Sequence, residues 1–166
     1  NDTTNEFHHG CEIVISNIKK LLKINDIEVI DSSLAGFNWK TNIDFLNNMK
    51  SADLIIVNGE GTLHHAQDRA KQIVLVGEYA KEFLKKPVVL INSTYQENGD
   101  DIASYLKYFD LIYVRDSLSQ IDLKKHGINS IIVPDMTFYS KYDLCRKKQR
   151  NFLGYTDSVI SKTSEV

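Results

Sequence analysis

The chain has 166 residues, of which 42% are hydrophobic and 25% are charged, as in an ordinary globular protein with a sizeable core. Lys and Arg together number 20 and Asp and Glu number 22, so the formal net charge is -2. This balance lacks the basic excess of a nucleic-acid-binding protein, and no apolar run approaches the roughly 20 residues of a membrane-spanning helix.

Predicted helices and strands alternate along the chain. Helices are indicated by apolar residues at spacings of three and four, and buried strands by short apolar runs such as DLIIVN and PVVLIN. In chain order the pattern predicts a helix over residues 11–25, a strand over 27–31, a helix over 41–50, a strand over 53–58, a helix over 66–84, a strand over 87–92, a helix over 101–108, a strand over 110–115, a helix over 116–126 and a strand over 129–134. Gly127 fits the C-cap of the last helix.

This alternation predicts βαβ units, and therefore an α/β fold with a Rossmann-like doubly wound parallel sheet. Residues 1–138 form the predicted N-terminal lobe. A polar opening runs directly into its first helix, where a doubly wound domain would begin with a strand, so we expect that the first strand of the lobe is missing. Residues 139–151 are polar and basic and read as a linker, and residues 152–166 read as the start of a truncated second lobe. Ligands of such a sheet lie beyond the carboxyl ends of its strands.

The first candidate binding motif is His8-His9-Gly10, at the start of the first predicted helix. A helix N-terminus exposes N–H groups and carries a partial positive charge, so it can hold a phosphate or a carboxylate. Gly10 would allow the ligand to approach the backbone closely. The alternative is a capped turn with two solvent-exposed histidines.

Residues 58–65 (NGEGTLHH) follow a predicted strand and are the most informative stretch of the chain. Two glycines around one acid predict a tight, open turn that presents Glu60 to a ligand. A carboxylate would repel a phosphate, so Glu60 suits general acid–base catalysis instead. The alternative is that the glycines only close a turn and Glu60 caps the next helix. The other candidate ligand-binding residues of this stretch are Asn58, Gly59, Gly61, Thr62, His64 and His65.

Polar side chains also follow the next two strands. The hydroxyl groups of Ser93 and Thr94 suit hydrogen bonds to a sugar or a carboxylate, or ordinary capping of the loop. Arg115 can hold a carboxylate through two hydrogen bonds, or it can be a structural ion-pair partner. Asp116 and Ser117 are favoured N-cap residues and are predicted to begin the following helix.

Asp135 follows the last predicted strand, so that Asp135 and Glu60 form a candidate carboxylate pair from different strands of one sheet. Such a pair can divide the roles of nucleophile and acid/base in transfer at an anomeric carbon. The alternative is that Asp135 caps the hinge between two lobes. Neither a metal site nor a cofactor is predicted.

In order and spacing, the segments HHGCE, NGEGTLHH, VRDSLS and VPDMTF resemble the polysaccharide pyruvyl transferase superfamily, and GYTDSV resembles the start of its second lobe. This resemblance implies one lobe of a GT-B-like two-lobed transferase that works in bacterial surface polysaccharide (capsule or lipopolysaccharide) biosynthesis. Glu60 is a departure, because many pyruvyl transferases have a Gly-rich loop without an acid there. NGEGT together with PDMTF looks more like the related retaining β-Kdo glycosyltransferases. That similarity implies transfer of a Kdo-like sugar from a CMP donor to a glycan acceptor, with Asp135 as nucleophile and Glu60 as acid/base.

Two other functions remain open. One is pyruvyl ketal formation from phosphoenolpyruvate, and the other is a non-catalytic glycan-binding lobe, which predicts exposed and unpaired carboxylates. Both transfer reactions act at C2 of a 2-keto-acid unit whose carboxylate needs donors. Arg115, His9 and the helix start at Gly10 are the candidate donors, together with the missing second lobe.

Cysteine usage and one basic run bear on the location of the protein. Cys11 and Cys145 are far apart in the sequence, which disfavours a disulfide framework and favours a reducing, cytoplasmic compartment. Residues 146–150 (RKKQR) predict a solvated linker surface or, as the alternative, peripheral contact with anionic lipid at the inner face of the cytoplasmic membrane.

Overall fold

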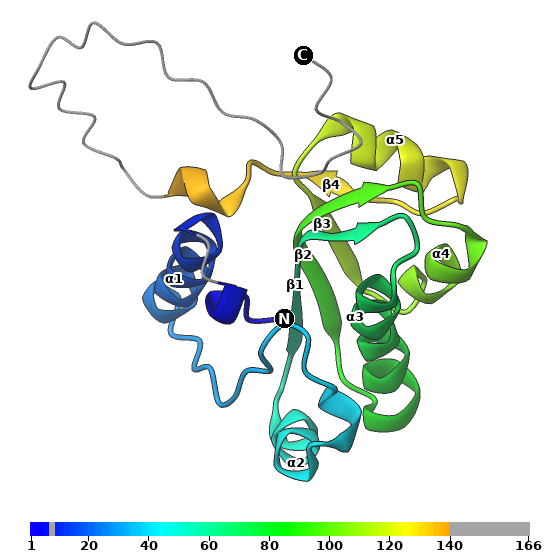
Figure 1. The fold of residues 1–166 in the computed structure, drawn as a ribbon. Coiled ribbons are helices and arrows are strands. Elements are labelled where there is room, and N and C mark those ends of the chain that lie inside the picture. Colours follow the sequence, from blue (N-terminus) through cyan, green and yellow to red (C-terminus); the bar gives the residue numbers. More distant parts are fainter. Residues whose placement is uncertain (7–8, 140–166) are drawn as a thin grey trace, which may run out of the picture.

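A four-stranded parallel sheet forms the centre of residues 1–6 and 9–139, which are the residues that the computed structural model describes (Figure 1). Its strands follow one another in the order β1 (Ile55–His64), β2 (Val88–Gln96), β3 (Leu111–Val114) and β4 (Ile131–Ile132). Each neighbouring pair is parallel, so the carboxyl ends of all four strands lie at one edge. This arrangement confirms the predicted α/β, Rossmann-like fold.

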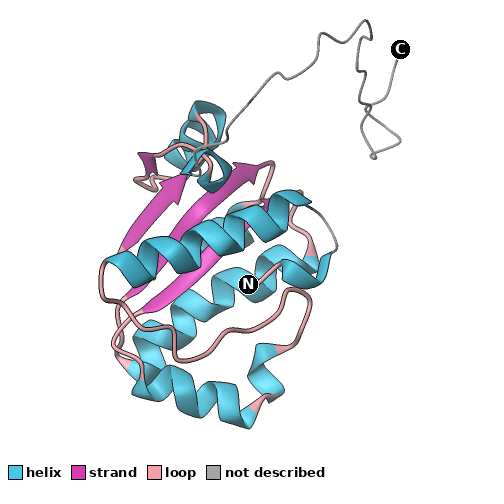
Figure 2. Cartoon of the chain, turned by 90° about the vertical axis from the view of Figure 1, so that its left-hand side faces the viewer, coloured by secondary structure: helices cyan, strands magenta, loops and turns pink. Residues whose placement is uncertain are grey.

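Helices cover both faces of the sheet (Figure 1). They are α1 (His9–Ile24), α2 (Ile43–Ser51), α3 (Asp68–Glu78), α4 (Asp100–Leu106) and α5 (Ser117–Lys125), and a π-helical segment, Tyr79–Leu84, continues α3. Figure 2, seen from the side of α1, shows this helix lying across the strands. Its Val14, Ile15 and Ile18 pack against Ile91 of β2. The larger core includes residues of the sheet together with residues of α3, α4 and α5.

The alternate positions of β2 show why the sheet is covered on both faces. Leu90 is 1% exposed and belongs to the larger core, whereas its neighbour Ile91 packs against the α1 cluster. Successive side chains of a strand point to opposite faces. An uninterrupted apolar run such as PVVLI therefore indicates a strand that is buried on both of its faces.

The predicted strand over residues 27–31 is wrong. The structure has no strand there, and Ile27, Val29 and Ile30 are 44%, 46% and 49% exposed. The nearest pairing is an isolated parallel bridge between Asp2 and Leu34. An apolar run becomes a strand only when another strand lies beside it to complete the hydrogen bonds, and the described part of the chain places none beside these residues.

β1 and β2 are longer than predicted, so the expected open turn at residues 58–65 is also wrong. Residues up to His64 belong to β1, and residues up to Gln96 belong to β2. The two strands stay paired through Glu60↔Ser93 and Leu63↔Tyr95, with a shift of register between these pairs. Mutual pairing of two neighbouring strands thus overrides the turn preference of the two glycines.

Local signals at the last helix are confirmed. The side chain of Asp116 accepts a hydrogen bond from the Ser119 N–H over 2.7 Å and caps α5, and Gly127 follows the helix with a φ of +72°. No helix of residues 1–6 and 9–139 is long and apolar enough to cross a membrane. The linker, the second lobe and His8 lie outside the described residues, so the predicted domain boundaries stay predictions.

Candidate functional site

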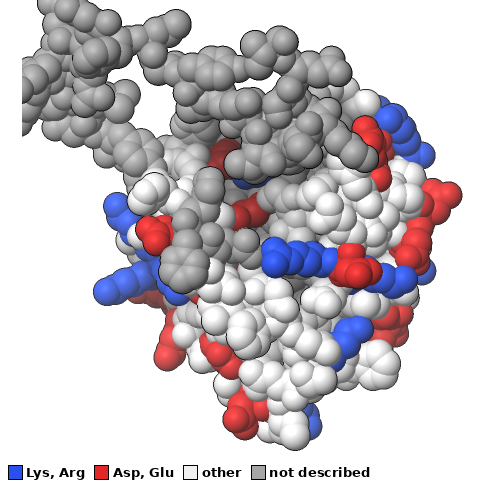
Figure 3. Space-filling view, viewed as in Figure 1, with Lys and Arg blue, Asp and Glu red and all other residues white. Residues whose placement is uncertain are grey.

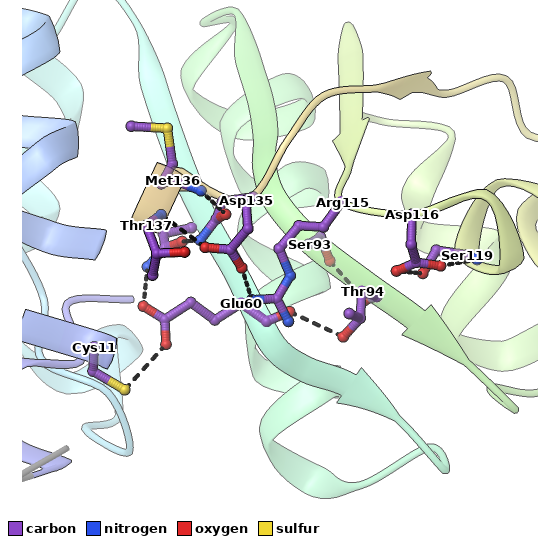
Figure 4. A network of polar contacts seen from close by, with 12 residues as sticks. Cys11, Glu60, Ser93, Thr94, Arg115, Asp116, Ser119, Asp135, Met136 and Thr137 are labelled. Atoms are coloured by element: carbon purple, nitrogen blue, oxygen red, sulfur yellow. Dashed lines mark hydrogen bonds and ion pairs between the residues drawn. The ribbon is translucent and has the colours of Figure 1, made fainter. Parts of the chain in front are cut away.

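Glu60 lies within β1 and pairs with Ser93 of β2, at the level where β3 ends (Figure 4). It is only 8% exposed. Its Oε1 accepts hydrogen bonds from Thr3 Oγ1 over 2.7 Å and from Asn58 Nδ2 over 3.0 Å. Its Oε2 accepts from Cys11 Sγ over 3.4 Å. A buried carboxylate requires such donors, because burial removes its hydration. Three separate segments of the chain therefore converge on this side chain.

The backbone is strained at two positions of this site. Glu60 has a φ of +42° and Asn92, on the neighbouring strand, has a φ of +53°. Left-handed conformations of residues other than glycine cost about 1–3 kcal/mol each and persist only where the surroundings enforce them. Such strain is concentrated at functional sites, and here both strained residues point their side chains into one hydrogen-bonded network.

Two buried amides connect Glu60 to the segment that follows β4. Asn58 and Asn92 are 5% and 1% exposed. Asn92 Nδ2 donates to Asn58 Oδ1 over 3.3 Å, and the backbone N–H of Met136 donates to Asn92 Oδ1 over 3.0 Å. The network thus runs from Glu60 through both amides to Met136, the residue that follows Asp135.

Asp135 forms an ion pair with Arg115, through its Oδ2 and the Nη1 of Arg115. Its Oδ1 accepts a hydrogen bond from the Thr137 N–H over 2.8 Å. Burial raises the pKa of Asp135, but the Thr137 hydrogen bonds and the charge of Arg115 outweigh burial and hold the pKa below its usual value. Asp135 is therefore an ionised carboxylate at neutral pH, and Arg115 is its ion-pair partner. Binding of a ligand carboxylate by Arg115 stays a prediction.

Gly59 and Ser93 have a packing role. A Cβ at Gly59 would lie 2.4 Å from Ser93 Oγ and 2.5 Å from Ser93 Cβ, so only glycine lets β1 approach β2 here. Ser93 is fully buried, and its hydroxyl donates to the backbone oxygen of Thr94 over 2.8 Å. Thr94 in turn donates to the backbone oxygen of Glu60 over 3.1 Å.

His64 and His65 lie at the end of β1, where their Nδ1 atoms are 2.9 Å apart. One of these ring nitrogens donates and the other accepts, and the tautomers of the two rings decide which. His65 Nε2 also lies 3.0 Å from Glu97 Oε2. His64 borders the cavity beside Glu60, whereas His65 is exposed and turned to Glu97.

The predicted helix-start motif leads to Cys11, the residue that follows it and that contacts Glu60. α1 begins at His9, which is exposed, and continues through Gly10 to Cys11, the donor to Glu60. The N-terminal end of a helix of 16 residues therefore adjoins the buried carboxylate. This end carries the partial positive charge of the helix, which suits an anionic ligand.

A cavity of about 490 Å³ opens beside Glu60. Gly61, Thr62 and His64 of β1 border it, and Gly61 has no atom within 4 Å of the place where a Cβ would lie. Figure 3 shows acidic and basic side chains together around the hollow on this face of the molecule. Residues that the sequence analysis did not select also line the cavity, among them Thr3, Cys11, Gly36, Phe37, Gln67 and Arg69.

Most of these residues could not be found by motif reasoning, because they come from other segments of the chain. Arg69 lies on α3, and its Nη2 would be 3.5 Å from a Cβ at Gly36, whose φ is +81°. Cys11 is the exception, since it stands inside the HHGCE motif. Within residues 1–6 and 9–139, no group of three or more His, Cys, Asp and Glu side chains could hold a metal ion.

Comparison with known proteins gives one match. The family model described as polysaccharide pyruvyl transferase matches residues 5–163. No curated protein and no solved structure matches the chain. The matched range includes all four strands and the site residues from Cys11 to Thr137.

Proposed function

This chain belongs to the polysaccharide pyruvyl transferase family of enzymes, and we propose that it transfers a pyruvyl group from phosphoenolpyruvate to a glycan acceptor. The family match supports this alternative of the sequence analysis over transfer of a Kdo-like sugar from a CMP donor, which was its first choice. Capsule or lipopolysaccharide as the acceptor, and the cytoplasmic location, belong to the proposal.

The reaction places defined demands on the site. Two acceptor hydroxyl groups form bonds to C2 of phosphoenolpyruvate, the C3 methylene takes up a proton and becomes a methyl group, and the bond from C2 to the phosphate oxygen breaks. One hydroxyl proton balances the proton gained by C3, and the other leaves with inorganic phosphate. The enzyme must therefore supply an acid–base group and donors for the carboxylate and phosphate.

Glu60 meets the first demand and carries the proposal. It is the only Asp or Glu among the described residues that line the cavity, and three side-chain donors hold its carboxylate in one orientation. A fixed carboxylate at the wall of a cavity can relay a proton between an acceptor hydroxyl and C3. We assign Glu60 as the acid/base group.

A guanidinium group, an imidazole group and the first turn of α1 border the same space. Arg69 and His64 line the cavity, and the helix start at His9 and Gly10 leads to Cys11 beside Glu60. A guanidinium group and a helix N-terminus both suit carboxylates and phosphates. We propose that these groups hold the donor, whereas Arg115 is held by Asp135 and acts mainly to place that carboxylate.

One observation favours a second candidate, retaining transfer of a Kdo-like sugar. Glu60 within β1 and Asp135 after β4 are two carboxylates whose segments one hydrogen-bonded network connects. A nucleophile and an acid/base group would be needed in that reaction. The ion pair with Arg115 keeps Asp135 ionised but also lowers its reactivity as a nucleophile. The non-catalytic alternative predicted exposed and unpaired carboxylates, and the burial of Glu60 argues against it.

Phosphorus NMR tests both candidates in one experiment, because the two donors are present together in each sample. The purified protein is given phosphoenolpyruvate, CMP-Kdo and a glycan acceptor, and a parallel tube contains the E60Q variant. Enzyme-dependent growth of inorganic phosphate with CMP-Kdo unchanged supports pyruvyl transfer. Growth of CMP with phosphoenolpyruvate unchanged assigns the second candidate and rejects the first. Equal rates for E60Q and the native protein would refute the role of Glu60.

A further inference from the structure

Three buried asparagines line up between α1, the sheet and the segment after β4. Asn17, Asn58 and Asn92 are 3%, 5% and 1% exposed. Asn17 Nδ2 donates to the backbone oxygen of Met136 over 2.7 Å, and the Met136 N–H donates to Asn92 Oδ1 over 3.0 Å. Both backbone polar groups of Met136 are therefore held by buried amides, which fixes the segment that carries Asp135.

The direction of donation along this line is set by the backbone. A side-chain amide can be turned over to exchange its donor and its acceptor, but a backbone N–H can only donate. Since the Met136 N–H points at Asn92, Asn92 must present Oδ1 to it and Nδ2 to Asn58. Asn58 must then accept through Oδ1 and present its own Nδ2 to Glu60. The line therefore delivers an N–H donor to Glu60 Oε1.

Asn92 holds this place in spite of backbone strain. Its φ of +53° lies in the left-handed region, which asparagine tolerates better than most residues but which only glycine adopts freely. An apolar side chain would leave Asn58 Oδ1 and the Met136 N–H without partners in a buried setting, which is costly. The hydrogen bonds of the Asn92 amide thus require asparagine here, whereas the positive φ alone would favour glycine.

We propose that Asn92 is a positioning residue that fixes the carboxylate of Glu60 relative to the Asp135 segment. It acts through Asn58 and Met136 and touches neither carboxylate in the contacts of the network. This inference rests on the proposed role of Glu60 as the acid/base group. Without the amide of Asn92, Asn58 Oδ1 loses its donor. The Asn58 amide is then held only through its Nδ2, by the Asn1 backbone oxygen and by Glu60, so one of the two donors to Glu60 Oε1 is positioned less firmly, while Thr3 remains.

The test is the N92G variant, because glycine adopts a positive φ without strain and removes only the amide. Misplacement of the Asn58 donor weakens one hydrogen bond to the charged Glu60, which predicts a decrease in kcat of up to about 10- to 100-fold. KM for phosphoenolpyruvate should stay within about twofold, because the groups that hold the donor are unchanged. The melting temperature should fall, because Asn58 Oδ1 and the Met136 N–H lose their partner in a buried setting, so kcat is compared at a temperature at which both proteins are folded.

N98A is the matched control. Asn98 is 4% exposed, and its amide joins the Leu63 carbonyl oxygen over 2.8 Å and the Ala66 N–H over 2.9 Å, away from both carboxylates. This variant removes a buried amide with the same number of bonds. It should lower the melting temperature while kcat stays within about twofold of the native value, because Glu60 keeps its donors. An equal loss of kcat in N98A and N92G would overturn the proposal.

N92D keeps the test decisive if N92G does not fold. Aspartate still accepts from the Met136 N–H but offers no donor to Asn58 at neutral pH, so kcat should decrease as in N92G. A folded N92G or N92D protein with native kcat overturns the inference. If E60Q is inactive while N92G is fully active, only the role of Asn92 fails. If E60Q itself is fully active, the proposed role of Glu60 fails as well.

Discussion

The thiol of Cys11 donates a hydrogen bond to Glu60 Oε2 over 3.4 Å. Cys11 is the third residue of α1 and is partly exposed, whereas Glu60 belongs to β1 and is buried. The contact joins the N-terminal end of a helix to the candidate acid/base group. It also places a thiol at the wall of the proposed donor site.

Alkylation of Cys11 should therefore inactivate the enzyme. Iodoacetamide adds a group that is larger than the thiol, removes its donor and fills space next to Glu60, so we expect loss of nearly all phosphate release. Phosphoenolpyruvate should slow the inactivation by covering the site. The rate is followed by phosphate assay, and the labelled residue by peptide mass spectrometry.

The second cysteine of the chain, Cys145, provides the control for this experiment. The C145S variant should lose activity with iodoacetamide as fast as the native protein. The C11S variant should keep whatever rate it has when the reagent is added. Sensitivity of C11S equal to that of the native protein would show that Cys11 is not the residue responsible.

The Arg115–Asp135 pair should make stability depend on pH at the acid end. Its environment lowers the pKa of Asp135, so the pair contributes stability above the unfolded pKa of about 3.9 and loses it as pH falls through the lower folded value. Between the two values the unfolded state binds more protons, and stability rises with pH. The D135N variant should flatten this part of the curve and cost about 1–3 kcal/mol near neutral pH. Urea unfolding from about pH 3 to neutral measures both effects, and parallel curves for D135N and the native protein would contradict the assignment.

Gly59 should not tolerate a side chain. The new Cβ of G59A would lie 2.4 Å from Ser93 Oγ and 3.1 Å from Ser93 Cα, which forces β1 away from β2 and should cost about 1–3 kcal/mol of unfolding free energy. G61A is the control, since no atom lies within 4 Å of its new Cβ, and it should change stability by less than about 0.5 kcal/mol. Chemical denaturation of the two variants compares them directly. Equal stabilities would mean that the close approach at Gly59 does not constrain the sheet.

Tyr95 should accept replacement by phenylalanine. Its side chain is 2% exposed, and its hydroxyl group has no hydrogen-bond partner among the residues described. Burial, followed by the charges of Asp122 and Asp100, raises the pKa of Tyr95 to about 12. Removing an unsatisfied buried hydroxyl should leave stability unchanged or raise it by about 1–2 kcal/mol. A loss of more than about 1 kcal/mol in Y95F would reveal a partner for the hydroxyl.

Much of the fold could be predicted because its signals are local. The uninterrupted apolar runs of β1 and β2 indicate strands that are buried on both faces, and their alternation with helical periods indicates a parallel sheet. Asp116 at the start of α5 and Gly127 after its end are recognised by cap preferences alone. These features depend on neighbours within a few residues.

The failed predictions concern pairing. The run IEVID has strand composition, but its side chains stay exposed because strand formation needs a neighbour that composition does not reveal. NGEGT has turn composition, yet pairing with β2 holds it in β1. In both cases tertiary context overrides a local preference.

By itself the sequence determined the α/β class, the succession of the later strands and the position of Glu60 and Asp135 after apolar runs, since these follow from periodicity. Only the tertiary structure decided what surrounds the two carboxylates. Glu60 is 57 residues from Thr3 and 49 from Cys11, and Asp135 is 20 residues from Arg115. Contacts over such separations form when the sheet brings its strand ends together, and no local pattern records them.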